Sequence, residues 1–138
     1  MRIFIDTDVV ISSLLSKKGA ANYLLHESKP RKFISNISLV EIQKVAKRLN
    51  IDRVEVDNLV ESKLQVVEIK SELAFIKSKY GEFVADVDDT HIVAGANSSK
   101  SRYLISYNLR HFKIDKIKDQ YGIILLTPAL FLQYLRSA

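Results

Sequence analysis

The chain has 138 residues, of which 47% are hydrophobic, carries a formal net charge of +5, and contains no cysteine. This composition predicts a compact protein with one domain over residues 1–138, and it excludes disulfides and thiolate metal ligands. No apolar run approaches the ~20 residues of a membrane helix, and no leader pattern precedes the first predicted strand, so we expect a cytoplasmic protein with no membrane contact.

Short strand-like runs alternate with helical patterns along the chain. In the first half the predicted elements are a strand at 2–6, helices at 8–16 and 20–28, a strand at 33–35, helices at 39–49 and 52–62, and an extended stretch at 65–67. In the second half they are helices at 69–80 and 89–98, strands at 103–106 and 123–126, and a helix that starts at Pro128. This alternation is typical of βαβ units, so we expect an α/β fold with a parallel sheet.

The first predicted strand ends on an acid. Asp6 follows the apolar run Ile3-Phe4-Ile5, at the end of a strand where open α/β sheets place their ligands. The packing of a short apolar strand needs no carboxylate there, so Asp6 is the strongest candidate for chemistry. Asp8 has an equally good structural interpretation, because aspartate is a favoured N-cap and a helical pattern begins at Val9.

The second candidate, Glu41, follows the second predicted strand. Ser38 and Glu41 have the spacing of a capping box, in which the glutamate reaches back to the backbone N–H of the cap residue. The strand before Glu41 should, however, end beside the first strand, which would bring Glu41 towards Asp6. Glu41 can therefore be a helix cap, a site residue, or both.

Three acids, Asp86, Asp88 and Asp89, occur within four residues at the start of a predicted helix. One or two acids at a helix N-terminus are unremarkable, since each is favoured there by about 0.3–1 kcal/mol. A third acid repels the others, and a divalent cation would relieve that repulsion. Asp89 opens the pattern Asp-x-x-Ile-x-Ala, which predicts a helix whose small face packs close to the sheet.

The fourth candidate segment follows the strand at 103–106 and contains Ser106 and Asn108. An asparagine offers a neutral oxygen to a hard cation or its water, but it is also common in turns. His111 can contact a phosphate or be an ordinary surface histidine. The three histidines of the chain are too dispersed for a zinc site, so the oxygen donors indicate Mg²⁺ or Mn²⁺.

Basic residues follow two of these segments. They are Lys44, Lys47 and Arg48 after Glu41, and Arg102, Arg110, Lys113, Lys116 and Lys118 around and after the last segment. A basic surface around an acidic centre suits a polyanion whose phosphates approach bound cations. Solvated outer faces of helices have the same composition, so charge alone does not establish RNA binding.

Taken in order, four segments resemble the PIN-domain ribonucleases, including the toxin nucleases of prokaryotic toxin–antitoxin pairs. The segments are 4–12, 35–42, 89–96 and 104–112. No single motif is specific, but the ordered set covers nearly the whole chain. The resemblance implies a three-layer α/β/α sandwich with a central, mainly parallel sheet.

The resemblance also implies the site. Asp6, Glu41 and Asp89 would be catalytic and would hold Mg²⁺ or Mn²⁺, with Asp86 and Asn108 completing the metal pocket. The implied substrate-binding residues are Ser106, Arg110 and His111. The implied activity is endonucleolytic cleavage of single-stranded or looped RNA, and the implied partners are an antitoxin protein and a second copy of the chain in a homodimer.

The sequence departs from the family pattern in two places. Asp8 stands where asparagine is commoner, and Asn108 and His111 stand where many relatives carry an aspartate. A PIN-like module that binds RNA or protein without cutting is therefore an alternative. A second alternative is a haloacid-dehalogenase-like phosphatase that uses Asp6 and Asp8, although the chain has no convincing lysine motif and Glu41 would then have no role.

Overall fold

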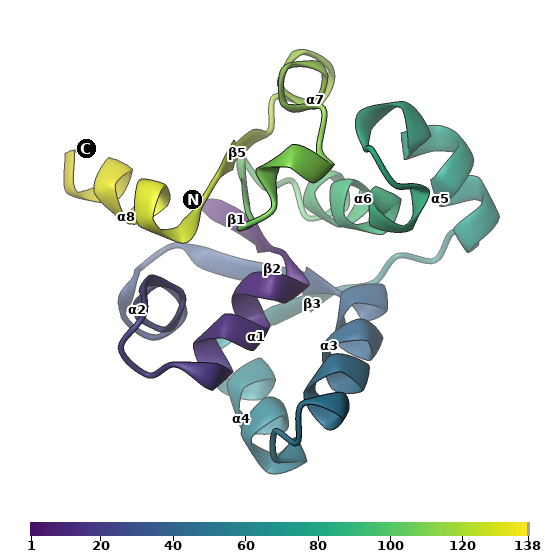
Figure 1. Cartoon of the computed structure of the whole chain (residues 1–138). Coiled ribbons are helices and arrows are strands. Elements are labelled where there is room, and N and C mark those ends of the chain that lie inside the picture. The colour runs from purple at the N-terminus through teal and green to yellow at the C-terminus, as the bar shows by residue number, and fades with distance from the viewer. Residues whose placement is uncertain (138) are drawn as a thin grey trace.

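In the computed structural model of the protein, which describes residues 1–137, a five-stranded sheet runs through the centre of the molecule (Figure 1). The strand order is β3–β2–β1–β4–β5, and each neighbouring pair is parallel. The strands are β1 (Arg2–Ile5), β2 (Arg31–Ser35), β3 (Gln65–Val67), β4 (Tyr103–Ile105) and β5 (Ile124–Leu126). The predicted α/β class with a parallel central sheet is confirmed.

Helices cover both faces of this sheet and complete the expected three-layer α/β/α sandwich. Figure 1 shows α5, α6 and α7 on one side of the strands and α1 to α4 on the other. The helices are α1 (Thr7–Leu15), α2 (Ala20–Glu27), α3 (Asn36–Arg48), α4 (Arg53–Lys63), α5 (Leu73–Tyr80), α6 (Thr90–Ser98), α7 (Ile114–Tyr121) and α8 (Pro128–Ser137). Short 3-10 turns are η1 (Gly81–Phe83), η2 (Val87–Asp89) and η3 (Leu109–His111).

Alternate residues of the central strand β1 supply the two halves of the hydrophobic core. Ile3 and Ile5 pack with side chains from α1, α2, α3, α4 and α8. Phe4 points the other way and packs with side chains from α5, α6 and α7. All three are fully buried. Burial on both faces explains why the strand reads as a continuous apolar run rather than as an alternating pattern.

The close packing of α6 on the sheet depends on Gly95. A Cβ atom at this position would lie 2.3 Å from Cζ of Phe4, so a larger residue would have to displace the aromatic ring or the helix. The small face predicted for this helix therefore sits directly on β1. This contact sets the position of the first turn of α6, and of the acid that precedes it, at the edge of the sheet.

The largest differences between the observed and the predicted helices are at α3, α5 and α7. Helix α3 begins at Asn36 rather than at residue 39, because the Ser35 hydroxyl accepts the Ser38 N–H and acts as the N-cap. Helix α5 begins at Leu73 rather than at residue 69, and the segment before it is held against α3 by the hydrogen bond from the Ile69 N–H to the Asn36 side chain. Helix α7 was not predicted: most of its residues are polar, and it buries only one side chain, Ile117.

Among residues 1–137, no helix is both long enough and apolar enough to cross a bilayer.

Candidate active site

Several of the predicted site residues gather at the edge of the sheet where its strands end. Because β1, β2 and β4 are parallel, the residues that follow them emerge at the same edge. A cavity of about 480 Å³ opens there. Its polar lining comes from four separate segments and includes Asp6, Asp8, Glu41, Asp89, Asn108 and His111.

Asp6 links the end of β1 to the start of α1. Its backbone N–H donates to the Ile105 carbonyl of β4 at 3.0 Å, and its carboxylate accepts the Thr7 N–H at 2.7 Å and the Ser106 hydroxyl at 2.8 Å. Burial, followed by the charge of Asp8, raises the pKa of Asp6 from 3.8 to about 7. Asp6 is also the N-cap of α1, so the interpretation of Asp8 as the cap is wrong.

Asp8 instead anchors the loop that follows β4. Its Oδ2 atom accepts the Tyr107 N–H at 3.1 Å and the Asn108 side-chain amide at 2.9 Å. Its Oδ1 atom is buried and has no hydrogen-bond partner within residues 1–137. Burial raises the pKa of Asp8, although the hydrogen bonds from the loop oppose this rise. The first acidic segment therefore fixes the fourth segment in space.

Ser106 lies behind the cavity rather than in it. The residue is 0% exposed, donates its hydroxyl hydrogen to Asp6 and accepts the Asn108 N–H at 3.0 Å. This burial does not fit the predicted contact with substrate, and Ser106 orients Asp6 instead. The side-chain nitrogen of Asn108 is committed to Asp8, which leaves its oxygen as the atom for a cation or a water.

Glu41 reaches the cavity from α3. One carboxylate oxygen accepts a short hydrogen bond from the Thr7 hydroxyl, and the other lies 3.5 Å from Nε2 of His91. The hydrogen bond from His91 is the largest cause of the lowered pKa of Glu41. The capping-box interpretation of Ser38 and Glu41 is wrong, because Ser35 caps α3 and the carboxylate of Glu41 points to the site.

His91 was missed in the sequence. The residue is 7% exposed in the first turn of α6, and its Nδ1 atom is buried without a hydrogen-bond partner in the described part of the chain. The only feature of the sequence that could have indicated a site role for His91 is its position two residues after Asp89. A histidine in a helix gives no indication that it contacts a glutamate fifty residues earlier in the chain.

Of the three acids before α6, only Asp89 lines the cavity. Its carboxylate lies 3.5 Å from Nδ1 of His111, and burial raises its pKa while the charge of His111 opposes the rise. Asp86 accepts the Asp88 N–H at 2.9 Å and caps η2. Asp88 is exposed and lies 3.7 Å from Lys77. Asp86 therefore acts on the site through its charge on Asp89.

The donor set fits a hard divalent cation. Carboxylate and amide oxygens dominate the polar lining of the cavity, and burial raises the pKa of Asp6, Asp8 and Asp89 more than their hydrogen bonds and the charge of His111 lower it. Within residues 1–137, no three Asp, Glu or His side chains converge closely enough to form a preformed metal cage. Instead, Glu41 lies beside His91 and Asp89 lies beside His111. A bound cation would replace these histidines as the partner of each carboxylate.

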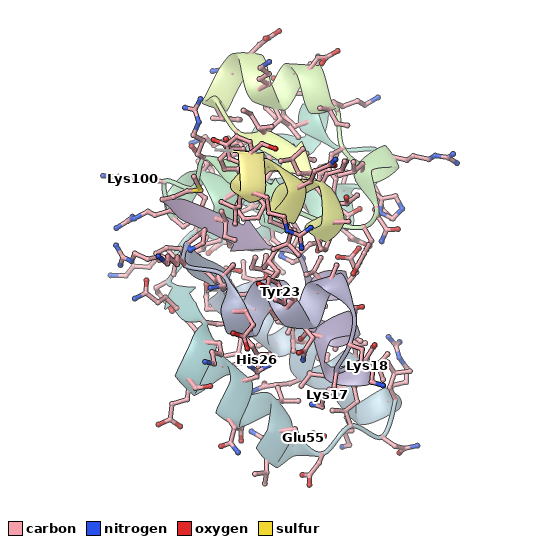
Figure 2. All side chains as sticks on the ribbon, turned by 90° about the vertical axis from the view of Figure 1, so that its left-hand side faces the viewer. Lys17, Lys18, Tyr23, His26, Glu55 and Lys100 are labelled. Carbon is pink, nitrogen blue, oxygen red and sulfur yellow. The ribbon has the colours of Figure 1, made fainter. Side chains whose placement is uncertain are left out.

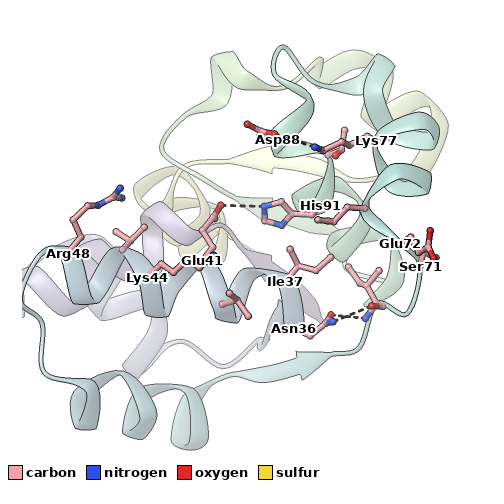
Figure 3. A pocket seen from close by; sticks show the side chains of 15 residues that line it. Asn36, Ile37, Glu41, Lys44, Arg48, Ser71, Glu72, Lys77, Asp88 and His91 are labelled. Carbon is pink, nitrogen blue, oxygen red and sulfur yellow. Dashed lines mark hydrogen bonds and ion pairs between the residues drawn. The ribbon is translucent and has the colours of Figure 1, made fainter.

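Two further cavities flank this one. A groove of about 910 Å³ between α3 and α5 shares Glu41 with the acidic cavity and carries Lys44, Arg48 and Lys77 in its lining (Figure 3). A pocket of about 400 Å³ on the other side shares Asn108 and His111 and also contains Arg110. The acidic cavity thus lies between two depressions that each contain basic side chains.

The chain was compared with known proteins. The sequence profile of the PIN domain family matches residues 2–110. The fold is similar to a toxin–antitoxin complex from Klebsiella pneumoniae (22% identity, TM-score 0.66, 93% of this chain and 98% of that chain) and to DNA-bound VapBC from Salmonella typhimurium (22%, 0.60, 93% and 98%). It is also similar to Mycobacterium tuberculosis VapC20, described as a sarcin-ricin loop cleaving toxin, with 18% identity and a TM-score of 0.56 over 74% of this chain and 86% of that chain. No curated protein sequence matches significantly.

Proposed function

The chain belongs to the PIN domain family, and from this premise we propose that it is a divalent-metal-dependent endoribonuclease of the toxin type. The observation that carries the proposal is the convergence of Asp6, Glu41 and Asp89 on one cavity from three separate elements. Packing requires none of these acids at the edge of the sheet. In the proposal the three are catalytic and hold Mg²⁺ or Mn²⁺, with Asn108 as a further oxygen donor.

The surrounding residues keep the catalytic carboxylates in place. Ser106 orients Asp6, while Thr7 and His91 hold the two oxygens of Glu41. A divalent ion, when bound, would lower the pKa of a coordinated water and offset negative charge on the phosphate. The residues themselves make a recessed acidic site that repels RNA until its charge is compensated. Single-stranded or looped RNA suits such a recess, because its phosphates can bend into it.

The remaining predicted residues take secondary parts in this proposal. Arg110 and His111 lie beside the cavity and are assigned to the RNA, since both can contact a phosphate. Asp86 is assigned to the electrostatics of the site, because its charge raises the pKa of Asp89. All of residues 1–138 are assigned to one nuclease domain, in a cytoplasmic protein.

We further assign the chain to a toxin–antitoxin pair. The support is that similar folds were solved in a toxin–antitoxin complex and in DNA-bound VapBC. The partner would be an antitoxin that covers the acidic cavity and inserts a basic side chain, and the chain would form a homodimer. Co-expression with the product of a neighbouring gene, followed by co-purification and size measurement, tests both assignments. A chain that purifies alone as a monomer would contradict them.

A binding module that does not cut is the second candidate. It is favoured by Asn108 and His111 in place of a family aspartate and by the lack of a preformed metal cage in residues 1–137. The phosphatase alternative loses support, because Asp8 is tied to the Tyr107 N–H and the Asn108 amide and is not free to act as a general acid.

The experiment that tests the proposed function is cleavage of a labelled mixed RNA by the purified protein with Mg²⁺ or Mn²⁺. EDTA and the Asp6→Asn variant serve as controls, and Mn²⁺ binding is measured separately by calorimetry. We expect metal-dependent cleavage that the variant lacks while its circular dichroism is unchanged. Metal binding without cleavage would favour the binding module, and full activity of Asp6→Asn would overturn the assignment of the site.

A further inference from the structure

We propose that the pocket beside Tyr107 is a nucleotide subsite, in which the tyrosine ring stacks on the base next to the cleaved phosphate and Arg110 contacts the RNA backbone. The proposal rests on the proposed function and goes beyond it, because it assigns a base contact to a residue outside the acidic cavity. It concerns single-stranded RNA, whose bases are free to stack on protein side chains.

The pocket has the size and place that a nucleotide needs. Its volume of about 400 Å³ falls within the range of about 300–1,000 Å³ that is typical of small-ligand sites. It shares Asn108 and His111 with the acidic cavity, so a nucleotide bound here lies directly beside the catalytic carboxylates. Thr127 also lines the pocket and carries a hydroxyl group.

The chemistry of the pocket also suits RNA. Tyr107 is 44% exposed although the buried strand β4 ends only two residues before it, at Ile105. An aromatic ring that stacks on a base contributes about 1–3 kcal/mol in single-strand binding proteins, with little preference for the base. Arg110 and His111 supply positive or polar groups, and in the described part of the chain no acidic side chain lines this pocket. The larger α3–α5 groove differs, because Glu72 and Asp88 contribute negative charge to its lining.

The backbone of Tyr107 is held in place by Asp8. The Tyr107 N–H donates to Asp8 at 3.1 Å, and the neighbouring Asn108 donates to the same oxygen at 2.9 Å. Asp8 lies in the first turn of α1, and Asp6 is the N-cap of the same helix. The hydrogen bonds therefore hold the stacking residue at a set place relative to the catalytic carboxylates. This arrangement gives Asp8 a role that neither capping nor metal binding explains.

A solvent-exposed tyrosine without function is the competing explanation, and Tyr23 provides the matched control. Tyr23 is 51% exposed on α2 and does not line any of the three cavities described above (Figure 2). The chain contains no tryptophan, so a tryptophan introduced at either position is the sole indole fluorophore.

The test introduces Tyr107→Trp or Tyr23→Trp into the Asp6→Asn background, which keeps the RNA intact and removes one repelling charge. A single-stranded oligoribonucleotide is then titrated into each protein. We expect the tryptophan emission of the Tyr107→Trp protein to fall at least twofold, because a stacked base quenches it, and that of the Tyr23→Trp protein to change by less than a tenth. Equal quenching of both proteins, or quenching of neither, would overturn the subsite.

A kinetic comparison in the otherwise unaltered protein provides the second readout. Tyr107→Ala should raise the KM for a single-stranded RNA at least fivefold, which corresponds to the lower end of the stacking range, about 1 kcal/mol. Tyr107→Phe keeps the ring and should stay within twofold. An unchanged KM for Tyr107→Ala would refute the stacking role. Quenching of the Tyr107→Trp protein in the Asp6→Asn background, together with no cleavage by the protein that retains Asp6, would retain the subsite and refute the nuclease, so the two proposals fail separately.

Discussion

Two acidic segments contribute to the site in different ways. In the segment after β1, both Asp6 and Asp8 line the cavity and accept hydrogen bonds from the β4 loop. In the segment before α6, three acids stand closer together in sequence, yet only Asp89 lines the cavity. The density of acids in a sequence is therefore a poor guide to a site. The position of an acid relative to the end of a buried strand is a better one, because it determines which way the carboxylate points.

The largest expected effect separates Asp89 from Asp88. We expect Asp89→Asn to lower metal-dependent RNA cleavage by about 10³-fold, since a lost metal ligand costs several kcal/mol of transition-state stabilisation. Asp88→Asn should stay within twofold, because Asp88 is exposed and paired with Lys77 outside the cavity. Initial rates at saturating Mg²⁺ measure both. Comparable losses in the two variants would show that the whole cluster acts at the site.

The second prediction concerns the pH dependence of stability in the metal-free protein. The pKa of Asp6 rises from 3.8 to about 7 on folding, because burial disfavours the charged carboxylate. The resulting loss of folding free energy is absent below pH 4, grows as the pH rises to about 7 and is constant above that. Asp6→Asn should match the wild type near pH 4 and exceed its free energy of unfolding by about 2–4 kcal/mol at pH 8. Urea denaturation in EDTA at both pH values measures this. A stability difference that is the same at both pH values would contradict the prediction.

The third prediction tests how the acidic segment before α6 is positioned. Gly95→Ala should lower the free energy of unfolding by about 1–3 kcal/mol, because the new Cβ clashes with Phe4 and forces α6 off the sheet. Cleavage should also fall, since Asp89 precedes this helix. Gly81→Ala is the control: its site is open and its φ of −59° suits alanine, so a gain of about 0.4–1 kcal/mol is expected. Similar stabilities of the two variants would exclude the packing explanation.

The smallest effect is expected at the ion pair between Lys77 and Asp88, before α6. Lys77→Gln removes the partner of Asp88, and both side chains are largely exposed. The free energy of unfolding should change by less than about 0.5 kcal/mol, because water and salt screen such pairs. Thermal denaturation at 20 and 200 mM salt measures the change. A larger loss that disappears at high salt would indicate that the pair stabilises η2.

Much of the fold and part of the site followed from local pattern. Apolar runs predicted the strands, and the acid after the first run identified Asp6. Helix α7 was missed because its sequence is mostly polar, and Glu41 was ambiguous because its spacing fitted a cap. The partners of Glu41 were not predictable, because Thr7 and His91 reach it across separations of 34 and 50 residues, and no local pattern encodes such a contact.

The sequence by itself determined the α/β alternation, the central apolar strands and the acids that follow them, because periodicity and strand ends are local properties of a chain. Which acids meet depends on how the strands pair and how the helices pack. Parallel pairing of β1 with β2 and β4 brings their ends to one edge, and the contact of Gly95 with Phe4 brings α6 down beside them. Burial then raises the pKa of Asp6 and ties Asp8 to the Tyr107 loop, because a buried carboxylate must find donors or a counter-charge.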